Sequence, residues 1–232
     1  MKKYISKQKE YGESVSYWLS IGDLMASILI IFILLFVFQI QNVNNELKKK
    51  EDVIDSLTAV KNKIIAKLRS EFEKEDMRID IDPITGAIKL DEKILFNRGK
   101  YELKDKGKEY LKVFIPKYIK ILLGDNEIKE EISQIIVEGH TDDIGSYIYN
   151  LDLSQKRAFE VVRYIYDDMK WFEEKGVLKY YITANGRSKM QLIKDENGKI
   201  NQEKSRRVEF KFKLKEEEVI QKIKEQISGG LK

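Results

Sequence analysis

The feature that most constrains this chain is an apolar segment near its start, YWLSIGDLMASILIIFILLFVFQI at 17–40. From Leu24 to Phe38 it has no charge, and its only polar side chain is Ser27. A helix needs about 20 such residues to cross roughly 30 Å of hydrocarbon. A cleaved signal peptide fits poorly, because the run is long, includes an acid and lacks a small-residue cleavage site. The sequence predicts an uncleaved membrane span at 17–41.

Composition excludes several kinds of site. The chain has 232 residues and no cysteine, so disulfides and thiolate metal sites are ruled out. Charged residues make up 35% and the net charge is +4, with lysine and glutamate interspersed almost throughout. Because that pattern is typical of a solvated surface, we expect no direct contact with nucleic acid. No cofactor and no metal site are predicted.

The span divides the chain into segments of different character. A polar leader precedes it at 1–16, and a charged stretch without Gly or Pro follows at 42–76. In that stretch Val53, Leu57, Val60 and Ile64 follow a 4-3-4 spacing over two heptads. This favours equally a seam between two copies of the chain and a plain helical stalk. A charged terminal helix is predicted at 215–232.

Between 77 and 214 the pattern indicates a mixed domain. Alternation around a Pro-x-x-Gly turn in MRIDIDPITGAIKL predicts a hairpin. A helical apolar spacing follows at 103–123, and Ser154 is a plausible N-cap for a second helix at 152–169. The remaining apolar runs predict strands at 133–139, 180–186 and 206–214. The order β-α-β-α-β-β predicts an α+β sandwich with helices on one face of a sheet.

Several motifs in this domain resemble the OmpA-like peptidoglycan-binding family, to which the flagellar stator protein MotB also belongs. The resemblance covers 88–212 and rests on Gly139-His140-Thr141-Asp142, Asn150, Leu153-Ser154, Arg157-Ala158, Gly186 and Arg206-Arg207-Val208. Two departures concern the far wall of the family's pocket. Ser205 stands where the family often has Asn, and NGRSKMQLI lacks the family's proline.

The resemblance implies a site for the diaminopimelate of a peptidoglycan stem. In the family a loop aspartate meets the ligand's ammonium and a helix arginine holds its carboxylate; by motif position these are Asp142 and Arg157. A guanidinium suits a carboxylate because it can donate two parallel hydrogen bonds. The expected site also includes Thr141, Asn150, Arg206 and Arg207. In the alternative interpretation, Arg157 only pairs with Asp142 and ties the loop to the helix.

Two further expectations concern chemistry. The single histidine, His140, has no Cys or His partner in its motif and is expected to be a structural hydrogen-bonding residue. No Ser/His/Asp order and no paired-carboxylate motif indicate hydrolysis. The domain is therefore expected to bind and not to be an enzyme.

The acid inside the span requires its own explanation. Ser16, Ser20, Asp23 and Ser27 follow the spacing 4-3-4 and share one helix face. Burying a carboxylate against lipid costs about 2.5–3.5 kcal/mol, so such acids usually face protein or a water path. A carboxyl that alternates between charged and neutral can carry an ion. The alternative is an interfacial aspartate about one turn from the aromatic Tyr17-Trp18 pair.

A second resemblance favours the ion-carrier interpretation. Trp18-x-x-x-x-Asp23-Leu24-Met25 resembles the start of the MotB span, where the aspartate carries the ion. A span, a helical linker and an OmpA-like domain in this order resemble a stator B subunit, most closely ZorB of Zorya anti-phage systems. Flagellar MotB, or a static cell-wall anchor without ion flux, are the alternatives.

The stator resemblance also implies partners and location. It implies a homodimer of this chain inside five copies of a multi-span A subunit like MotA or ZorA, with H⁺ or Na⁺ as the transported ion. Ser20 and Ser27 would line the ion path, and 42–52 would form a plug. The expected location is the bacterial cytoplasmic membrane, with the N-terminus in the cytoplasm and the C-terminal domain periplasmic, on peptidoglycan.

Overall fold

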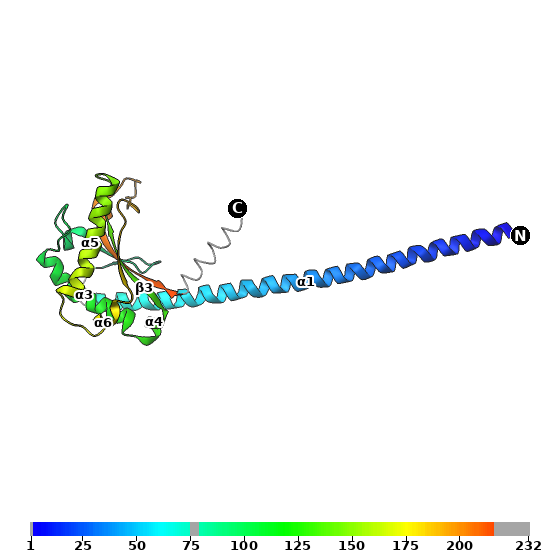
Figure 1. The fold of residues 1–232 in the computed structure, drawn as a ribbon, viewed down its shortest axis with the longest axis horizontal. Coiled ribbons are helices and arrows are strands. Elements are labelled where there is room, and N and C mark those ends of the chain that lie inside the picture. The colour runs from blue at the N-terminus through cyan, green and yellow to red at the C-terminus, as the bar shows by residue number, and fades with distance from the viewer. Residues whose placement is uncertain (1, 75–78, 216–232) are drawn as a thin grey trace. The chain divides into compact units, whose positions relative to one another are not determined.

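The computed structural model describes residues 2–74 and 79–215 (Figure 1). Within the first range it does not describe the side chains of 2–17, 19, 20, 50–54, 56 and 57. Apart from its first residue, the predicted helix at 215–232 lies outside the described residues. The chain forms two compact units, Met1–Ile54 and Asp55–Lys232, which are described separately below.

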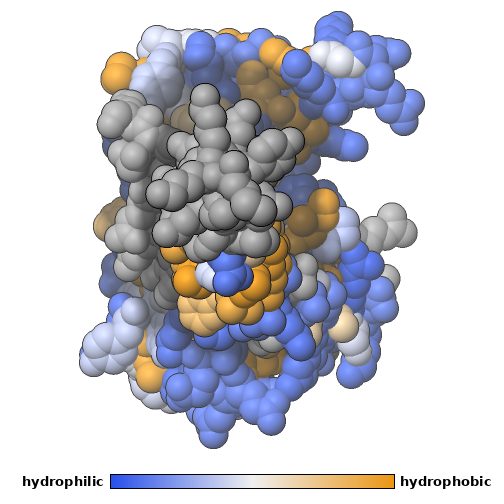
Figure 2. All heavy atoms as spheres, turned by 90° about the vertical axis from the view of Figure 1, so that its right-hand side faces the viewer, coloured by the Kyte–Doolittle hydropathy of each residue, from blue (hydrophilic) through white to orange (hydrophobic). Residues whose placement is uncertain are grey.

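The described residues of the first unit, 2–54, all belong to one helix. The helix α1 is assigned over Lys2–Glu73, and its segment Ile21–Lys49 is long and apolar enough to cross a membrane. None of the described apolar side chains of this segment is buried, and those from Leu24 to Leu47 are all exposed. Figure 2, which is viewed from the N-terminal side of Figure 1, shows hydrophobic side chains gathered around this helix. The predicted apolar helix is thus confirmed.

The second unit is a mixed five-stranded sheet with helices on one face. The strands are β1 (Asp80–Ile81), β2 (Ile88–Asp91), β3 (Ile132–His140), β4 (Ile182–Gly186) and β5 (Arg207–Leu214), and the helices are α2 (Glu92–Leu95), α3 (Asp105–Leu123), α4 (Asn126–Glu131), α5 (Tyr147–Asp167), α6 (Lys175–Leu178) and α7 (Gln202–Ser205). The spatial order is β1-β2-β5-β3-β4. Among these described strands, only β3 and β4 pair in parallel. The predicted α+β class is confirmed.

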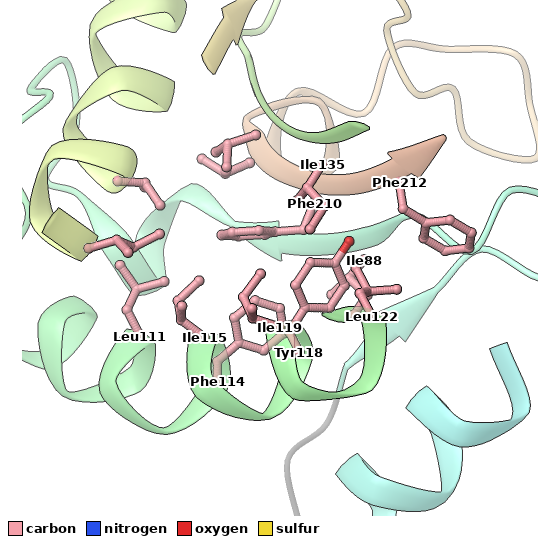
Figure 3. Packing of buried hydrophobic residues seen from close by; sticks show 14 of the residues in the cluster. Ile88, Leu111, Phe114, Ile115, Tyr118, Ile119, Leu122, Ile135, Phe210 and Phe212 are labelled. Atoms are coloured by element: carbon pink, nitrogen blue, oxygen red, sulfur yellow. The ribbon is translucent and has the colours of Figure 1, made fainter. Parts of the chain in front are cut away.

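The core lies between the sheet and the two long helices (Figure 3). The apolar face of α3 points toward β5, where the rings of Phe114 and Phe210 meet edge to face with centroids 4.9 Å apart. The helix α5 adds Ala158, Val161 and Ile165. Such burial is the main favourable contribution to folding, at about 25 cal/mol per Å² of apolar surface.

The end of the predicted linker belongs to this core. Ile64, Leu68 and Phe72 of α1 are almost completely buried within the second unit. Lys63 and Lys67 pair with Glu127 and Asp125 at 2.6 and 2.5 Å. Ile64 was one of the four predicted seam positions, so its apolar character is explained within one chain. The side chains of Val53 and Leu57 lie outside the described residues.

The helix α5 starts earlier than predicted. It begins at Tyr147 with Ser146 as its N-cap, whose hydroxyl accepts from the backbone N–H of Tyr149 at 3.2 Å. Ser154, the predicted cap, lies two turns inside the helix. Its hydroxyl donates to the carbonyl of Leu151 and accepts from the N–H of Ser188. A serine that is satisfied in this way is tolerated within a helix, which is why residue type alone chose the wrong cap.

Candidate functional site

A cavity of about 140 Å³ lies beyond the C-terminal end of β3. It is lined by Glu92, Arg98, Gly99, Thr141, Asp142, Ile144, Tyr149, Asn150, Leu153, Arg157 and Arg206. These residues come from α2, the loop before α3, the loop after β3, the first three turns of α5 and the residue before β5. Five of the six residues predicted for ligand binding meet here, and the exception is Arg207.

Two glycines let α5 approach the sheet closely enough to form the cavity. A Cβ atom at Gly139 would overlap the carbonyl oxygen of Ser154, and one at Gly186 would lie 2.5 Å from the backbone nitrogen of Gln155. Real Cβ atoms do not come that close to backbone, so neither position can take a side chain without a shift. This contact sets the position of Arg157, which follows Ser154 by one turn.

The loop after β3 is held by its own side chains. Oδ1 of Asp142 accepts from the N–H of Ile144 at 3.1 Å, and Nδ2 of Asn150 donates to the carbonyl of Ile144 at 2.9 Å. The hydroxyl of Thr141 donates to the carbonyl of Asp142 at 3.2 Å. Through its contact with Ile144, Asn150 orients the loop. The loop presents Oδ2 of Asp142 toward Arg206.

Arg157 forms a buried ion pair that the sequence did not indicate. Its Nη2 donates to Oε1 of Glu92 at 2.7 Å, and its Nε donates to the carbonyl of Lys100 at 2.9 Å. The structure contains no pair between Arg157 and Asp142 among its described contacts. Glu92 follows β2 directly and belongs to no motif quoted above. Its place at the end of β2, beside the cavity, is known only from the three-dimensional structure.

Arg206 links the two carboxylates of the cavity. Its Nη1 donates to Oδ2 of Asp142 at 2.6 Å, and its Nε lies 3.4 Å from Oε2 of Glu92. Burial lowers the pKa of Arg206, but the carboxylates of Asp142 and Glu92 raise it by more, so it stays charged. The lining therefore holds two carboxylates and three guanidiniums, which suits a ligand with an ammonium and a carboxylate.

Arg207 lies on the other face of the sheet. Successive side chains of a strand point to opposite faces, so Arg206 and Arg207 cannot both reach the cavity. The Nε of Arg207 donates to Oε1 of Glu209 at 2.5 Å, and its Nη1 donates to the carbonyl of Ser205 at 3.1 Å. Of the two adjacent arginines expected in the site, Arg206 lines the cavity and Arg207 does not.

Comparisons with known proteins agree with this architecture. The sequence profile of the OmpA family matches residues 95–206. The chain is 33% identical to the Zorya protein ZorB of Escherichia coli Crooks over 96% of this chain and 99% of that protein. The chain belongs to the ZorB family. A ZorB from another Escherichia coli strain is 23% identical over 90% of this chain and 85% of its own length.

A solved structure shares the fold of this ZorB-family chain. A MotB-like protein from Desulfovibrio vulgaris superposes with a TM-score of 0.51 at 19% sequence identity, covering 68% of this chain and 94% of that one. The resemblance to ZorB predicted from the motifs is thus confirmed, together with the OmpA-like fold that it implied.

The opposite face of the sheet in this ZorB-family chain carries a buried charged cluster. Glu138, His140 and Glu209 place one possible metal-ligating atom each within 4.8 Å of one another. The Nζ of Lys211 already bridges the two carboxylates, at 2.5 Å from Oε2 of Glu138 and 2.7 Å from Oε2 of Glu209. The Nη2 of Arg187 lies 2.8 Å from the other carboxylate oxygen of Glu138, Oε1. With three fixed cations for two carboxylates, the electrostatics disfavour a metal ion here.

His140 has a structural environment, as expected for a histidine without a Cys or His partner in its motif. It is completely buried, its Nδ1 lies 3.4 Å from the carbonyl of Met190, and its Nε2 faces the two glutamates at 3.6 and 3.7 Å. Burial raises the pKa of Glu138, but the nearby His140 ring and the hydrogen bonds from Lys211 and Arg187 lower it well below its usual range. The glutamates are therefore anchored as carboxylates.

In the apolar segment, Asp23 and Ser27 are joined through the backbone. The hydroxyl of Ser27 donates to the carbonyl oxygen of Asp23, four residues earlier, at 2.8 Å. Such a bond satisfies a hydroxyl within a helix and leaves the Asp23 carboxyl, which is exposed in the single chain, for other contacts. The side chain of Ser20 lies outside the described residues.

Proposed function

We propose that this chain is the B subunit of a stator-type membrane motor and is anchored to peptidoglycan by its C-terminal domain. The observation that carries the proposal is the meeting of Asp142 and Arg157 in one cavity of a ZorB-family chain. The family resemblance assigns the ligand ammonium to Asp142 and the ligand carboxylate to Arg157. Diaminopimelate in a peptide stem supplies both groups. Thr141, Asn150 and Arg206 complete the proposed site.

Ion transport is assigned to the span. In the proposal Asp23 binds a proton or a sodium ion and releases it on the other side of the membrane. Each elementary charge that crosses gains about 2.3 kcal/mol per 100 mV, so many small steps are summed. A dimer of this chain would stand inside a ring of five A subunits. Alternating occupancy of Asp23 would turn this ring around the wall-anchored dimer.

Orientation follows from the ligand. Because peptidoglycan lies outside the cytoplasmic membrane, the proposed anchoring would place the C-terminal domain in the periplasm and the N-terminus in the cytoplasm. In the defence role, rotation would pass through the A subunit to effectors that attack invading DNA. The cavity contains no nucleophile with a paired base, which supports a binding domain over a wall hydrolase.

The deciding experiment is phage plating on cells that carry the whole native operon. Wild type is compared with Asp23→Asn and with Asp55→Asn, a matched loss of an exposed acid outside the span, at equal expression. We expect Asp23→Asn to abolish protection and Asp55→Asn to retain it. Protection by Asp23→Asn would overturn ion transport through this residue.

A static wall anchor predicts a different pattern, since it needs the cavity but not the span acid. Under that alternative Asp23→Asn protects fully and Arg157→Ala fails. Co-sedimentation of the purified full chain with peptidoglycan sacculi tests the anchor separately. We expect wild type to sediment without releasing muropeptides. Release of fragments would instead identify a hydrolase.

A further inference from the structure

One polar atom in the cavity has no partner. Oε2 of Glu92 is shielded from solvent and, among the described residues, accepts no hydrogen bond. The side chain is only 5% exposed, and its other oxygen is engaged by Arg157. A buried carboxylate oxygen without a donor is costly, so its retention calls for an explanation.

A donor for this oxygen is close at hand. Nε of Arg206 lies 3.4 Å away, within ion-pair distance but without a hydrogen bond, because Nη1 of the same guanidinium is engaged by Asp142 at 2.6 Å. Arg206 thus stands between two acids and hydrogen-bonds one of them. Its side chain is 20% exposed and lines the cavity, so a small rotation would bring it to the other acid.

Ligand binding changes this balance. The proposed ligand ammonium needs Oδ2 of Asp142, since Oδ1 already accepts from the backbone of Ile144. Oδ2 is where Arg206 donates in the unliganded chain, so ammonium and guanidinium compete for one oxygen. A displaced guanidinium inside the cavity requires another acceptor, and Oε2 of Glu92 lies 3.4 Å from its Nε without a hydrogen-bond donor of its own among the described residues.

We propose that Glu92 is a positioning residue of this site: it holds Arg157 through Oε1 and receives Arg206 through Oε2 when a ligand ammonium occupies Asp142. This inference rests on the proposed peptidoglycan-binding function and goes beyond it. After the transfer, both guanidiniums are held by one carboxylate, and Oδ2 of Asp142 is available to the ligand ammonium. The site then selects a zwitterionic end over one that lacks the ammonium.

The test compares two probes on the purified full chain in detergent. One is a muramyl tripeptide that carries meso-diaminopimelate, and the other is the same molecule with its free side-chain amine acetylated. Glu92→Gln keeps the size of the side chain and a carbonyl for Arg157 but removes the charged acceptor for Arg206. Because a charge-assisted bond contributes about 1.5–3 kcal/mol, calorimetry should show that Glu92→Gln binds the amine probe at least roughly tenfold more weakly than wild type does.

The acetylated probe makes the result specific. It leaves Arg206 on Asp142, so we expect Glu92→Gln to change its affinity much less than that of the amine probe. Glu109→Gln, an exposed acid on α3, is the matched control and should change neither. Equal weakening of both probes would overturn the transfer and leave Glu92 a purely structural partner of Arg157.

A second variant decides the question if Glu92→Gln does not fold. Arg206→Gln removes the competitor for Asp142, so the ratio of amine-probe to acetyl-probe affinity should rise above that of wild type. An unchanged or lower ratio would overturn this inference but would leave the proposed wall-binding function standing. If wild type binds neither probe, the proposed wall-binding function fails, and this inference fails with it.

Discussion

Arg157 and Glu92, which are 65 positions apart in sequence, form an ion pair in which neither side chain is more than 5% exposed. The residue that the motif assigns to ligand binding is therefore also half of a buried pair that joins α5 to α2. Stability and binding are consequently linked at this position. Variants of Arg157 must be interpreted with both effects in view.

Arg157→Ala is expected to lower the stability of the domain and to abolish peptidoglycan binding. Removing one partner of a buried pair typically costs about 3–5 kcal/mol, because the remaining charge stays desolvated. Thermal unfolding of the full chain in detergent measures the first effect, and co-sedimentation with sacculi measures the second. An unchanged melting temperature would contradict the buried pair.

The double variant Glu92→Leu/Arg157→Met separates these two effects. Replacing a buried ion pair with apolar residues of similar volume is often neutral or stabilising. We expect the double variant to unfold at a higher temperature than Arg157→Ala while still failing to bind sacculi. Recovery of binding in the double variant would show that Arg157 acts only through stability.

Most of the fold followed from patterns that depend on nearest neighbours. The spacing of apolar residues predicted α3, and the apolar run at 206–214 predicted β5 with an error of one residue at its start. The start of α5 was missed because the choice between Ser146 and Ser154 depends on Ser188, a tertiary contact. Residue type alone does not contain that information.

The site was predicted only where a motif carried it. Asp142 and Arg157 meet in the cavity as the resemblance implied, but their partners, Arg206 and Glu92, come from segments that the fold brings together. Arg206 and Arg207 were indistinguishable as residue types. Strand alternation separates them, and it required knowing where β5 begins. Glu92 had no sequence signal of its own.

Gly139→Ala should destabilise the domain strongly. The added Cβ would overlap the carbonyl oxygen of Ser154, and both groups are backbone, so neither can yield without moving α5 or β3. Overpacking of this kind costs about 3 kcal/mol. Gly176→Ala in α6 is the control, because its nearest neighbour is the ring of Trp171 at 3.3 Å. Equal melting temperatures for the two variants would contradict the close approach of α5.

Lys211→Met should destabilise the charged cluster on the opposite face. The variant removes the ammonium that bridges Glu138 and Glu209, whose side chains are 1% and 4% exposed. Arg187 and Arg207 remain, so a loss of about 3 kcal/mol is expected, at the lower end for a broken buried pair. Lys213→Met, an exposed change two residues along β5, is the control. Thermal unfolding compares the two, and an equal effect would refute the bridge.

The same cluster predicts a loss of stability in acid. Desolvation raises the pKa of Glu138 and Glu209, but their cationic partners lower both values below the ordinary 4.5. An unfolded chain therefore takes up these protons first, so the contribution is complete above about pH 4.5 and is lost as the pH falls toward the lower folded values. We expect the melting temperature to decrease once the pH drops below this value. Glu138→Gln should be less stable near neutrality and lose less on acidification; a parallel pH dependence would exclude Glu138 as a source.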